Sequence, residues 1–548
     1  MNHLLDMVHH NPGEAPFETV FSDPSVLRGC GYTGQVLKHI NTSVSFAAAG
    51  DFFPAGSEAR RWLDATSERI DGEIRAAKSA GLAVFYHLDL ILLPQKLVEA
   101  YRDEICDADG RISLDRPKTL EIHRMLFDEL FERFPQVDGF VIRIGETYLH
   151  DTPYHTGNGA VACHTFGLTD EEKAGFVKLI DFLREEVCVR HGRKVFFRTW
   201  DCFPDRFHAN LDNYLEITDR IEPHENLLFS IKHTQLDFWH WTEFNPCLTQ
   251  GRHRQIVEVQ CQREYEGKGA WPNYVMKQVI DGYPENDPVR GLRDIAGHPL
   301  IDGIWTWSRG GGWYGPYLQS EFWPELNVRV LARWAQDPTR SEEEVFLETC
   351  REDFGFSAEA AVQFRELALI AAEATFKGRY CAAFDRNRSA VPWSSRWPLE
   401  PTCNWMRDDC LCGLHRLQAV FDRLVAIGAV DEALEEKREA VVLWERVAGL
   451  GRTMDWPNPE LKQKVASSIE YGLRLFRMAE CGWRALLGND PEAAEEYRCA
   501  KADYEKVADL PYAATLFESK EWSLPGEPVP SGLDESVRQG VFRFQIDN

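Results

Sequence analysis

Short apolar runs alternate with longer helical segments along the first 330 residues. Seven runs rich in β-branched and aromatic residues are typical of buried strands. They are TSVSFA (42–47), LAVFYHLDL (82–90), GFVIRI (139–144), KVFFRTW (194–200), NLLFSIK (226–232), IVEVQ (256–260) and GIWTW (303–307). Segments 57–80, 117–134 and 170–191 between them have a helical pattern. Strand–helix alternation over this length predicts an α/β fold with parallel strands, a (β/α)8 TIM barrel.

The eighth strand is expected before residue 40, around ETVFSD (18–23) or GYTGQVL (31–37). After residue 335 the pattern changes, because Ser341 and Glu344 form a predicted capping box ahead of apolar residues at helical spacing. Further amphipathic helices are predicted at 357–376, 409–427, 430–449, 459–487 and 491–507. We therefore expect a catalytic barrel over residues 1–335 and an all-α C-terminal domain over residues 336–548.

The charge of the chain limits its partners. The formal net charge is −26, which argues against nucleic acid because phosphate binding needs a concentrated basic face. The same charge disfavours docking on anionic lipid, and no apolar run approaches the roughly 20 residues that span a bilayer. Neutral sugars, or acidic substrates held in a locally basic pocket, remain as ligands.

Cysteine usage and the first residues predict a cytoplasmic protein. The 14 cysteines have no C-x-x-C spacing and form no visible disulfide framework, so we expect reduced thiols. The start, MNHLLDMVHHNPGEAPF, lacks a basic region followed by an apolar one, and no signal peptide is expected.

Polar and aromatic residues gather where the predicted strands end, which is where barrel enzymes hold their functional groups. Glu258 is unusual because it lies inside the strand IVEVQ. Such a carboxylate either faces solvent or is held where chemistry needs it. The candidate residues are Tyr86, His87, Arg143, Glu146, Arg198, Trp200, Lys232, His233, Asp237, Glu258, Tyr265, Trp305, Trp307 and Trp313.

Carboxylates from three strand ends amid many tryptophans favour sugar chemistry. Carboxylates can supply acid and base to a glycosidic oxygen and to water, whereas tryptophan faces stack on sugar rings. Arg198 and Lys232 add positive charge to an acidic protein, which suits a ligand with its own carboxylate. This chemistry requires no cofactor.

Two other functions remain open from the residues. His150, Asp151 and His155, together with His87, are possible ligands of a metal-dependent sugar isomerase or hydrolase, although their spacing specifies no metal. Alternatively, the aromatic residues could form a non-catalytic carbohydrate-binding barrel. Three retained carboxylates argue against the second alternative, because their burial is costly.

Four segments together resemble the bacterial and fungal α-glucuronidases, glycoside hydrolases that release glucuronic acid from xylan fragments. EVQCQREY (258–265) is similar to that family's E-x-Q-x-x-x-E-Y segment. SIKHTQLDF (230–238), FFRTW (196–200) and VIRIGE (141–146) resemble its lysine-, arginine- and acid-bearing strand ends. Their order agrees with the family, as does the layout of a barrel followed by helices, whereas the family's N-terminal β-sandwich domain is not expected here.

The resemblance implies an inverting glycosidase that cleaves a terminal α-linked sugar, a uronic acid above all. Glu146 would be the general acid, and Asp237 and Glu258 would activate the attacking water. Arg198 and Lys232 would contact the sugar in the first subsite. A homodimer is also expected from the resemblance.

Overall fold

The computed structural model places eight of its described strands in one closed parallel barrel. Neighbours in the chain are neighbours in the barrel, and β10 pairs with β1 to close the circle. The predicted TIM barrel is thereby confirmed. Its strands are β1 (His3–Val8), β2 (Gly34–Lys38), β3 (Ala83–Asp89), β5 (Gly139–Arg143), β7 (Lys194–Arg198), β8 (Leu227–Lys232), β9 (Arg254–Gln260) and β10 (Ile301–Arg309). The structure describes residues 1–9, 17–145, 147, 149, 152–160, 168–201, 204–240, 242–311, 317–386, 414–488 and 490–514.

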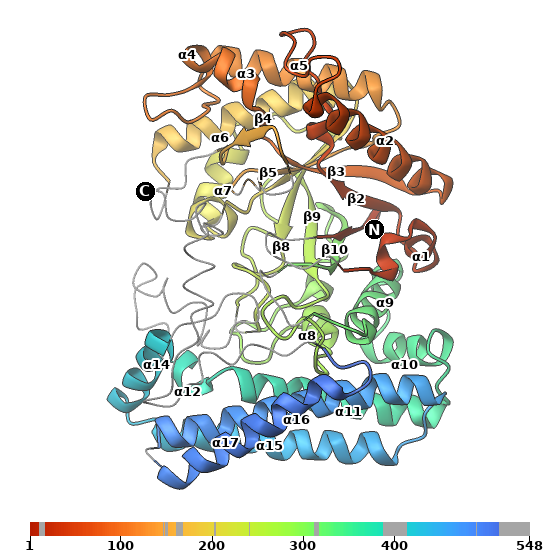
Figure 1. Cartoon of the computed structure of the whole chain (residues 1–548), viewed down its shortest axis with the longest axis vertical. Helices are drawn as coiled ribbons and strands as arrows, with labels where there is room; N and C mark the ends of the chain where they lie inside the picture. The colour runs from red at the N-terminus through yellow and green to blue at the C-terminus, as the bar shows by residue number, and fades with distance from the viewer. Residues whose placement is uncertain are drawn as a thin grey trace.

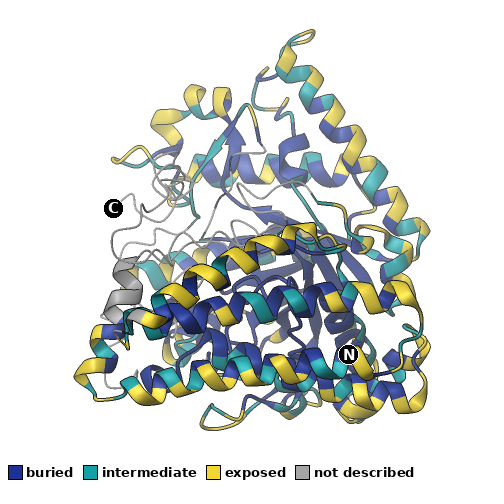
Figure 2. Ribbon diagram, turned by 60° about the horizontal axis from the view of Figure 1, so that its bottom comes forward, coloured by how far each residue is buried: buried dark blue, intermediate teal, exposed yellow. Residues whose placement is uncertain are grey.

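Helices surround the barrel, and the strands lie inside them as a buried layer (Figures 1 and 2). On α2, for example, Leu63, Ile70 and Ile74 are buried at helical spacing, whereas other positions face solvent. The helices here are α1 (Pro24–Gly29), α2 (Glu58–Ser79), α3 (Gln95–Ala100), α4 (Arg102–Ile105), α5 (Pro117–Arg133), α6 (Asp170–Leu183), α7 (Leu211–Thr218), α8 (Met276–Asp281) and α9 (Phe322–Gln336). A small antiparallel pair, β4 (Leu92–Pro94) and β6 (His155–Gly157), lies beside the barrel.

One predicted strand is wrong. Residues 42–47 are not a strand: Thr42 and Ser43 end the 3-10 turn Ile40–Ser43, and a loop follows. Thr42 and Ser43 each donate a side-chain hydrogen bond to a backbone carbonyl three residues earlier, at 2.6 Å in both cases. These local bonds satisfy the chain without a strand partner, which outweighs the β-branched composition of the segment.

Of the first two barrel strands, the sequence predicted β2 but not β1. β2 overlaps GYTGQVL, one of the two predicted positions, and extends one residue beyond it, whereas Val20–Ser22 in the other is a 3-10 turn. β1 was missed because Asp6 interrupts its apolar run. Asp6 is nevertheless buried, since Thr306 and Ser308 of β10 donate hydrogen bonds to its carboxylate.

Side chains alternate between the inside and the outside of the barrel. Outward residues such as Phe197 and Val257 pack into the large core beneath the helices. Inward residues form a separate apolar cluster, which we call the inner apolar layer: Leu5, Met7, Val36, Phe85, Val141, Phe196, Leu228, Ile256, Trp305 and Trp307.

A bundle of helices lies against one side of the barrel, with α11, α15, α16 and α17 next to one another (Figure 1). The predicted capping box of Ser341 and Glu344 is confirmed at the start of α10. The helices are α10 (Glu342–Glu352), α11 (Ala358–Arg379), α12 (Ala382–Arg386), α14 (Leu414–Ala426), α15 (Val430–Thr453), α16 (Pro459–Leu486) and α17 (Pro491–Glu505). The predicted domain boundary at residues 335/336 falls at the end of α9 and stays a prediction.

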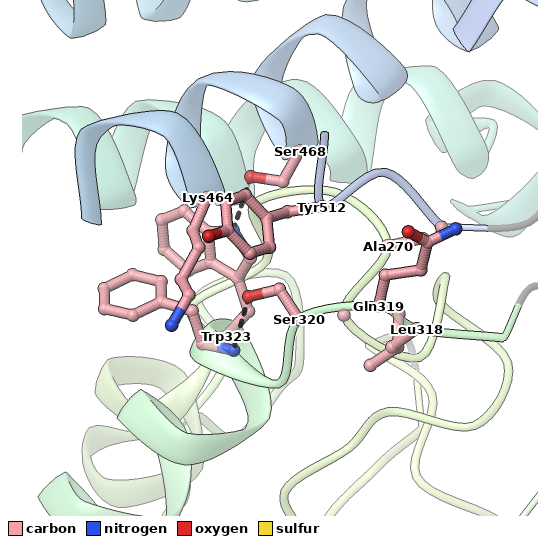
Figure 3. A pocket seen from close by; sticks show the side chains of 11 residues that line it. Ala270, Leu318, Gln319, Ser320, Trp323, Lys464, Ser468 and Tyr512 are labelled. Carbon is pink, nitrogen blue, oxygen red and sulfur yellow. Dashed lines mark hydrogen bonds between the residues drawn. The ribbon is translucent and has the colours of Figure 1, made fainter. Parts of the chain in front are cut away.

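The bundle and the barrel are tightly packed where they meet. Trp323 of α9 donates a hydrogen bond to Ser468 of α16 at 2.9 Å, and Figure 3 shows these side chains beside Ser320 and Tyr512. Gly472 is needed at the same contact, because a Cβ there would lie 2.9 Å from Cβ of Trp271. Within the described ranges, no helix has the length and apolar character to cross a membrane.

Candidate functional site

The polar strand-end residues lie above the inner apolar layer, because the alternation continues along each strand. On β7, Phe196 belongs to that layer and Arg198 follows two residues later. On β9, the same step leads from Ile256 to Glu258. The register also pairs Arg198 with Ser230 of β8. Groups distant in the sequence therefore meet inside the carboxyl-terminal half of the barrel.

Glu258 is fully buried and bound by Arg198. Nε of Arg198 lies 3.1 Å from Oε2 of Glu258, and Nη2 lies 2.6 Å from Oε1. The guanidinium lies 5.7 Å from the ring centre of Trp305 and 5.3 Å from that of Trp307. Trp305 also donates to the hydroxyl of Ser230 at 2.7 Å, and that hydroxyl is 3.5 Å from Glu258. Glu258 is therefore an interior carboxylate paired with the Arg198 guanidinium through two hydrogen bonds.

Asp237 is held differently, on the loop after β8. Nζ of Lys232 and the hydroxyl of Tyr265, the latter at 3.3 Å, donate to its two oxygens. Lys232 lies 3.8 Å from the ring centre of Trp200, which is a cation–π contact. The side chain of Asp237 keeps 19% of its surface exposed, whereas that of Glu258 has 0%. Asp237 is therefore the accessible carboxylate of the two.

Arg143 and His87 complete the basic side of the site. Arg143 of β5 makes two hydrogen bonds to Asp89 of β3, and both side chains are buried. His87 lies 3.4 Å from Nη1 of Arg198. Burial, and then the charges of Arg143 and Arg198, hold the pKa of His87 well below its usual range. His87 is thus a neutral imidazole, able to accept a hydrogen bond but not to carry charge.

His233 lies beside the site rather than inside it. Its ring stacks on Phe238 with 5.6 Å between centres, and Nδ1 is 3.4 Å from the backbone oxygen of Glu258. Burial, followed by the charge of Arg263, lowers the pKa of His233 to about 3. Its side chain therefore supports the loop after β8 in the neutral form.

Tyr86 lies on the wrong face of its strand for the predicted role. Its hydroxyl donates to Glu73 of α2 at 3.3 Å, and the ring packs in the large core outside the barrel. Its neighbour Phe85 instead belongs to the inner apolar layer. Strand alternation thus removes Tyr86 from the candidate site, although the sequence run did not reveal which face was inside.

Four predicted residues lie outside the described residues: Glu146, His150, Asp151 and Trp313. The described chain reaches Gly145, directly before Glu146. A Cβ on Gly145 would lie 2.7 Å from the backbone of Asp201, so this position needs a glycine for close approach. β5 therefore directs its carboxyl end toward the end of β7, which carries Arg198.

The third residue of the alternative metal site, His155, is buried on β6. Its ring contacts those of Phe53 and Trp62, at 6.1 and 5.5 Å between centres. Burial lowers its pKa, and Nδ1 lies 3.0 Å from the carbonyl of Pro153. In the part of the chain that the structure describes, no group of three or more His, Cys, Asp or Glu residues is placed to hold a metal ion.

The structure adds two residues to the site, His9 and Gln260, that the sequence pattern did not predict. His9 follows β1, with its ring 6.2 Å from that of His87 and 4.8 Å from that of Trp307. Gln260 is buried two residues after Glu258, and its Oε1 accepts the Glu264 amide at 2.6 Å. The period of two along β9 is the signal that could have found Gln260. His9 could not be predicted in this way, because the strand that it follows, β1, was not recognised in the sequence.

Comparisons with known proteins identify barrel glycoside hydrolases as structural neighbours. The sequence matches no family model and no curated protein. Among solved structures, it resembles a glycoside hydrolase family 138 enzyme targeting pectin rhamnogalacturonan II, with 13% identity and a TM-score of 0.51 over 94% of this chain. An O-GlcNAc hydrolase of Thermobaculum terrenum is also similar, with 9% identity and a TM-score of 0.38 over 93% of this chain and 89% of its own.

This likeness concerns the fold. The chain spans 63% of the length of the family 138 enzyme. At such identities the shared feature is the architecture, since one barrel fold supports many chemistries. The function must therefore be argued from the side chains described above.

Proposed function

We propose that this protein is an inverting glycoside hydrolase that removes a terminal α-linked sugar carrying a carboxylate, as α-glucuronidases do. One observation carries the proposal: Arg143, Arg198 and Lys232 converge from three successive strands, each beside a carboxylate, at the carboxyl end of a barrel. The glycoside hydrolase neighbours are consistent with it.

The basic residues keep donors for a substrate carboxylate. Arg198 uses Nε and Nη2 for Glu258, and its Nη1 points toward neutral His87. Lys232 has three ammonium protons, one of which serves Asp237. An anionic sugar can therefore bind without breaking the existing pairs. Trp200, which lies beside Lys232 at the carboxyl end of β7, would then contact the sugar.

We assign the water-activating role to Asp237 and an orienting role to Glu258. A general base must reach the water, and Asp237 is partly exposed while Lys232 and Tyr265 fix its orientation. Both oxygens of Glu258 are engaged by Arg198. Glu258 would hold that guanidinium in position for the sugar carboxylate, as outer-shell groups hold reactive ones elsewhere.

Glu146 completes the proposed mechanism as the general acid. It would protonate the glycosidic oxygen while Asp237 takes a proton from water on the opposite face of the sugar. Inverting enzymes hold these two carboxyl groups about 6.5–9.5 Å apart so that the water fits between them. The product sugar is released with inverted anomeric configuration.

The proposal is tested with 4-nitrophenyl α-glycosides of glucuronic acid, galacturonic acid and glucose. We expect turnover of a uronide, little turnover of the glucoside, and NMR detection of the β-anomer as the first product. Asp237→Asn should lower kcat by about 10²–10⁴-fold. Glu146→Gln should lower kcat by a similar factor on an oligosaccharide. On the nitrophenyl substrate the loss should be smaller, because that leaving group needs little protonation.

Glu222→Gln is the matched control. Glu222 is exposed and follows α7, so this variant should keep full activity. Retention of configuration, or full oligosaccharide turnover by Glu146→Gln, would contradict the mechanism. Loss of activity on chelation would instead support the metal-dependent alternative.

A further inference from the structure

The helical bundle reaches the candidate site through one aromatic cluster. Tyr380, directly after α11, packs with Trp200, Trp239 and Tyr265 of the barrel loops, and Leu236 belongs to the same cluster. The rings of Trp239 and Tyr265 are stacked, with 4.5 Å between centres and 19° between planes. Because Tyr265 also donates to Asp237, the proposed base, this cluster connects the bundle with the candidate site.

The hydroxyl of Tyr380 joins the two loops that hold Asp237. It donates to Oε1 of the buried Glu266, on the loop after β9. The backbone amide of His240, on the loop after β8, lies 3.0 Å from the same oxygen and 3.2 Å from the hydroxyl. Asp237 is three residues before His240, so these hydrogen bonds restrain the loop that carries Asp237.

Glu266 is a firm anchor for this contact. Burial alone would raise its pKa, but the charge and hydrogen bond of Arg263 outweigh burial and lower the pKa to about 2. Nε of Arg263 lies 2.8 Å from Oε2, and Asn273 donates to the same oxygen at 3.2 Å. Glu266 is therefore a carboxylate near neutral pH, and its bond to Tyr380 is charge-assisted.

The bundle also holds the backbone of Tyr380 in place, through Lys437. Lys437 of α15 is buried and donates to the backbone oxygens of Lys377 and Tyr380. A lysine that binds the last carbonyls of a helix stabilises its carboxyl end. Tyr380 is thus presented to the barrel by a capped helix rather than by a loose loop.

We propose that Tyr380 is a positioning residue through which the helical bundle sets the orientation of Asp237. This inference rests on the proposed function, since it assigns Asp237 as the base. The connection runs from Tyr380 through Glu266 to the His240 amide, and in parallel through the stacked rings to the Tyr265 hydroxyl. Small displacements of a catalytic group are costly in rate, so a bond remote from the substrate can affect turnover.

Tyr380→Phe tests the proposal because it removes the hydroxyl and keeps the ring. Tyr504→Phe is the matched control: Tyr504 is also buried, and its hydroxyl meets that of Tyr471 at 3.1 Å within the bundle. We expect Tyr380→Phe to lower kcat on the uronide about 10- to 100-fold with a smaller change in KM. Tyr504→Phe should leave both parameters unchanged.

A double-mutant cycle separates positioning from a general structural role. In the Asp237→Asn background, Tyr380→Phe should cause no further loss, because the group it orients is already absent. Hydrogen exchange of residues 233–240, a readout independent of activity, should be faster in Tyr380→Phe than in the wild type or Tyr504→Phe.

Additive losses in the cycle, an equal loss in Tyr504→Phe, or unchanged exchange at residues 233–240 would each overturn the positioning role. A wild-type protein that hydrolyses no uronide would refute the proposed function instead. The exchange comparison still decides in that case whether Tyr380 orders the loop that carries Asp237.

Discussion

The two halves of the barrel interior use the same strands for opposite purposes. On β9, Ile256 belongs to the inner apolar layer, whereas Glu258, one step further along the same face, is paired with Arg198. The adjacent strand repeats the change from Leu228 to Lys232. The amino-terminal half is filled by apolar side chains, and the carboxyl-terminal half holds the ion pairs. Trp305 and Trp307 of the inner apolar layer lie at the boundary, beside Arg198.

The difference shows which half is built for stability. Apolar contacts are non-directional and gain free energy from burial alone. Buried ion pairs roughly balance attraction against desolvation, and replacing both partners with apolar groups is often neutral or stabilising. The Arg198–Glu258 pair is therefore expected to add little net stability, which agrees with the binding role that we propose for Arg198.

The largest expected effect comes from breaking the Arg198–Glu258 pair on one side. Glu258→Leu leaves a buried guanidinium without its partner and should lower the free energy of unfolding by about 3–5 kcal/mol, measured by urea denaturation. Adding Arg198→Met should restore most of that stability, while activity stays absent. A double variant as unstable as the single one would contradict the comparison.

Asp6 provides a second test, because it is a buried carboxylate bonded to hydroxyls and an amide instead of a guanidinium. Thr306 and Ser308 donate to it at 2.5–3.1 Å. Burial raises its pKa from 3.8 to about 7, even though these bonds act in the opposite direction. The folded state therefore binds an extra proton between about pH 4 and pH 7, relative to the unfolded chain.

Stability from this group is fully present below about pH 4 and is lost as the pH rises toward 7, by at most about 1.4 kcal/mol per pH unit. Asp6→Asn, which imitates the protonated form, should remove this slope. Urea denaturation of both proteins from pH 4.5 to 7.5 measures the difference. Parallel stability curves would show that Asp6 does not hold the proton.

The smallest effect is expected in the apolar half. Ile256→Val removes one buried methyl group two residues from Glu258 and should cost about 0.5–1.5 kcal/mol in unfolding free energy. Uronide turnover should stay at the wild-type level, because the charged half is untouched. A marked loss of turnover would mean that the two halves are not separable.

Most of the fold was predictable because its signals are local. Strand runs such as GFVIRI and the capping box at Ser341 carry their structure in their own composition and spacing. The segment 42–47 misled because side-chain bonds to its own backbone are invisible in a β-branched pattern. β1 was missed because the partners of Asp6 lie about 300 residues away on β10.

The candidate site was predictable only in part. The strand-end position identified Arg198, Lys232, Asp237 and Glu258, which the structure brings together. It also selected Tyr86, which faces α2. A run that is apolar throughout does not show which residues point inward, and this parity is decided by the neighbouring strands.

By itself, the sequence determined the alternation of strands and helices, the acidic charge of the chain, and the types of side chain at each strand end. Only the tertiary structure decided which of these side chains meet. Register made Glu258 the partner of Arg198 and left Asp237 accessible beside Lys232 and Tyr265. The reason is physical: hydrophobic periodicity is a property of neighbouring residues, whereas the pairing of buried charges depends on strands brought together by closure of the barrel.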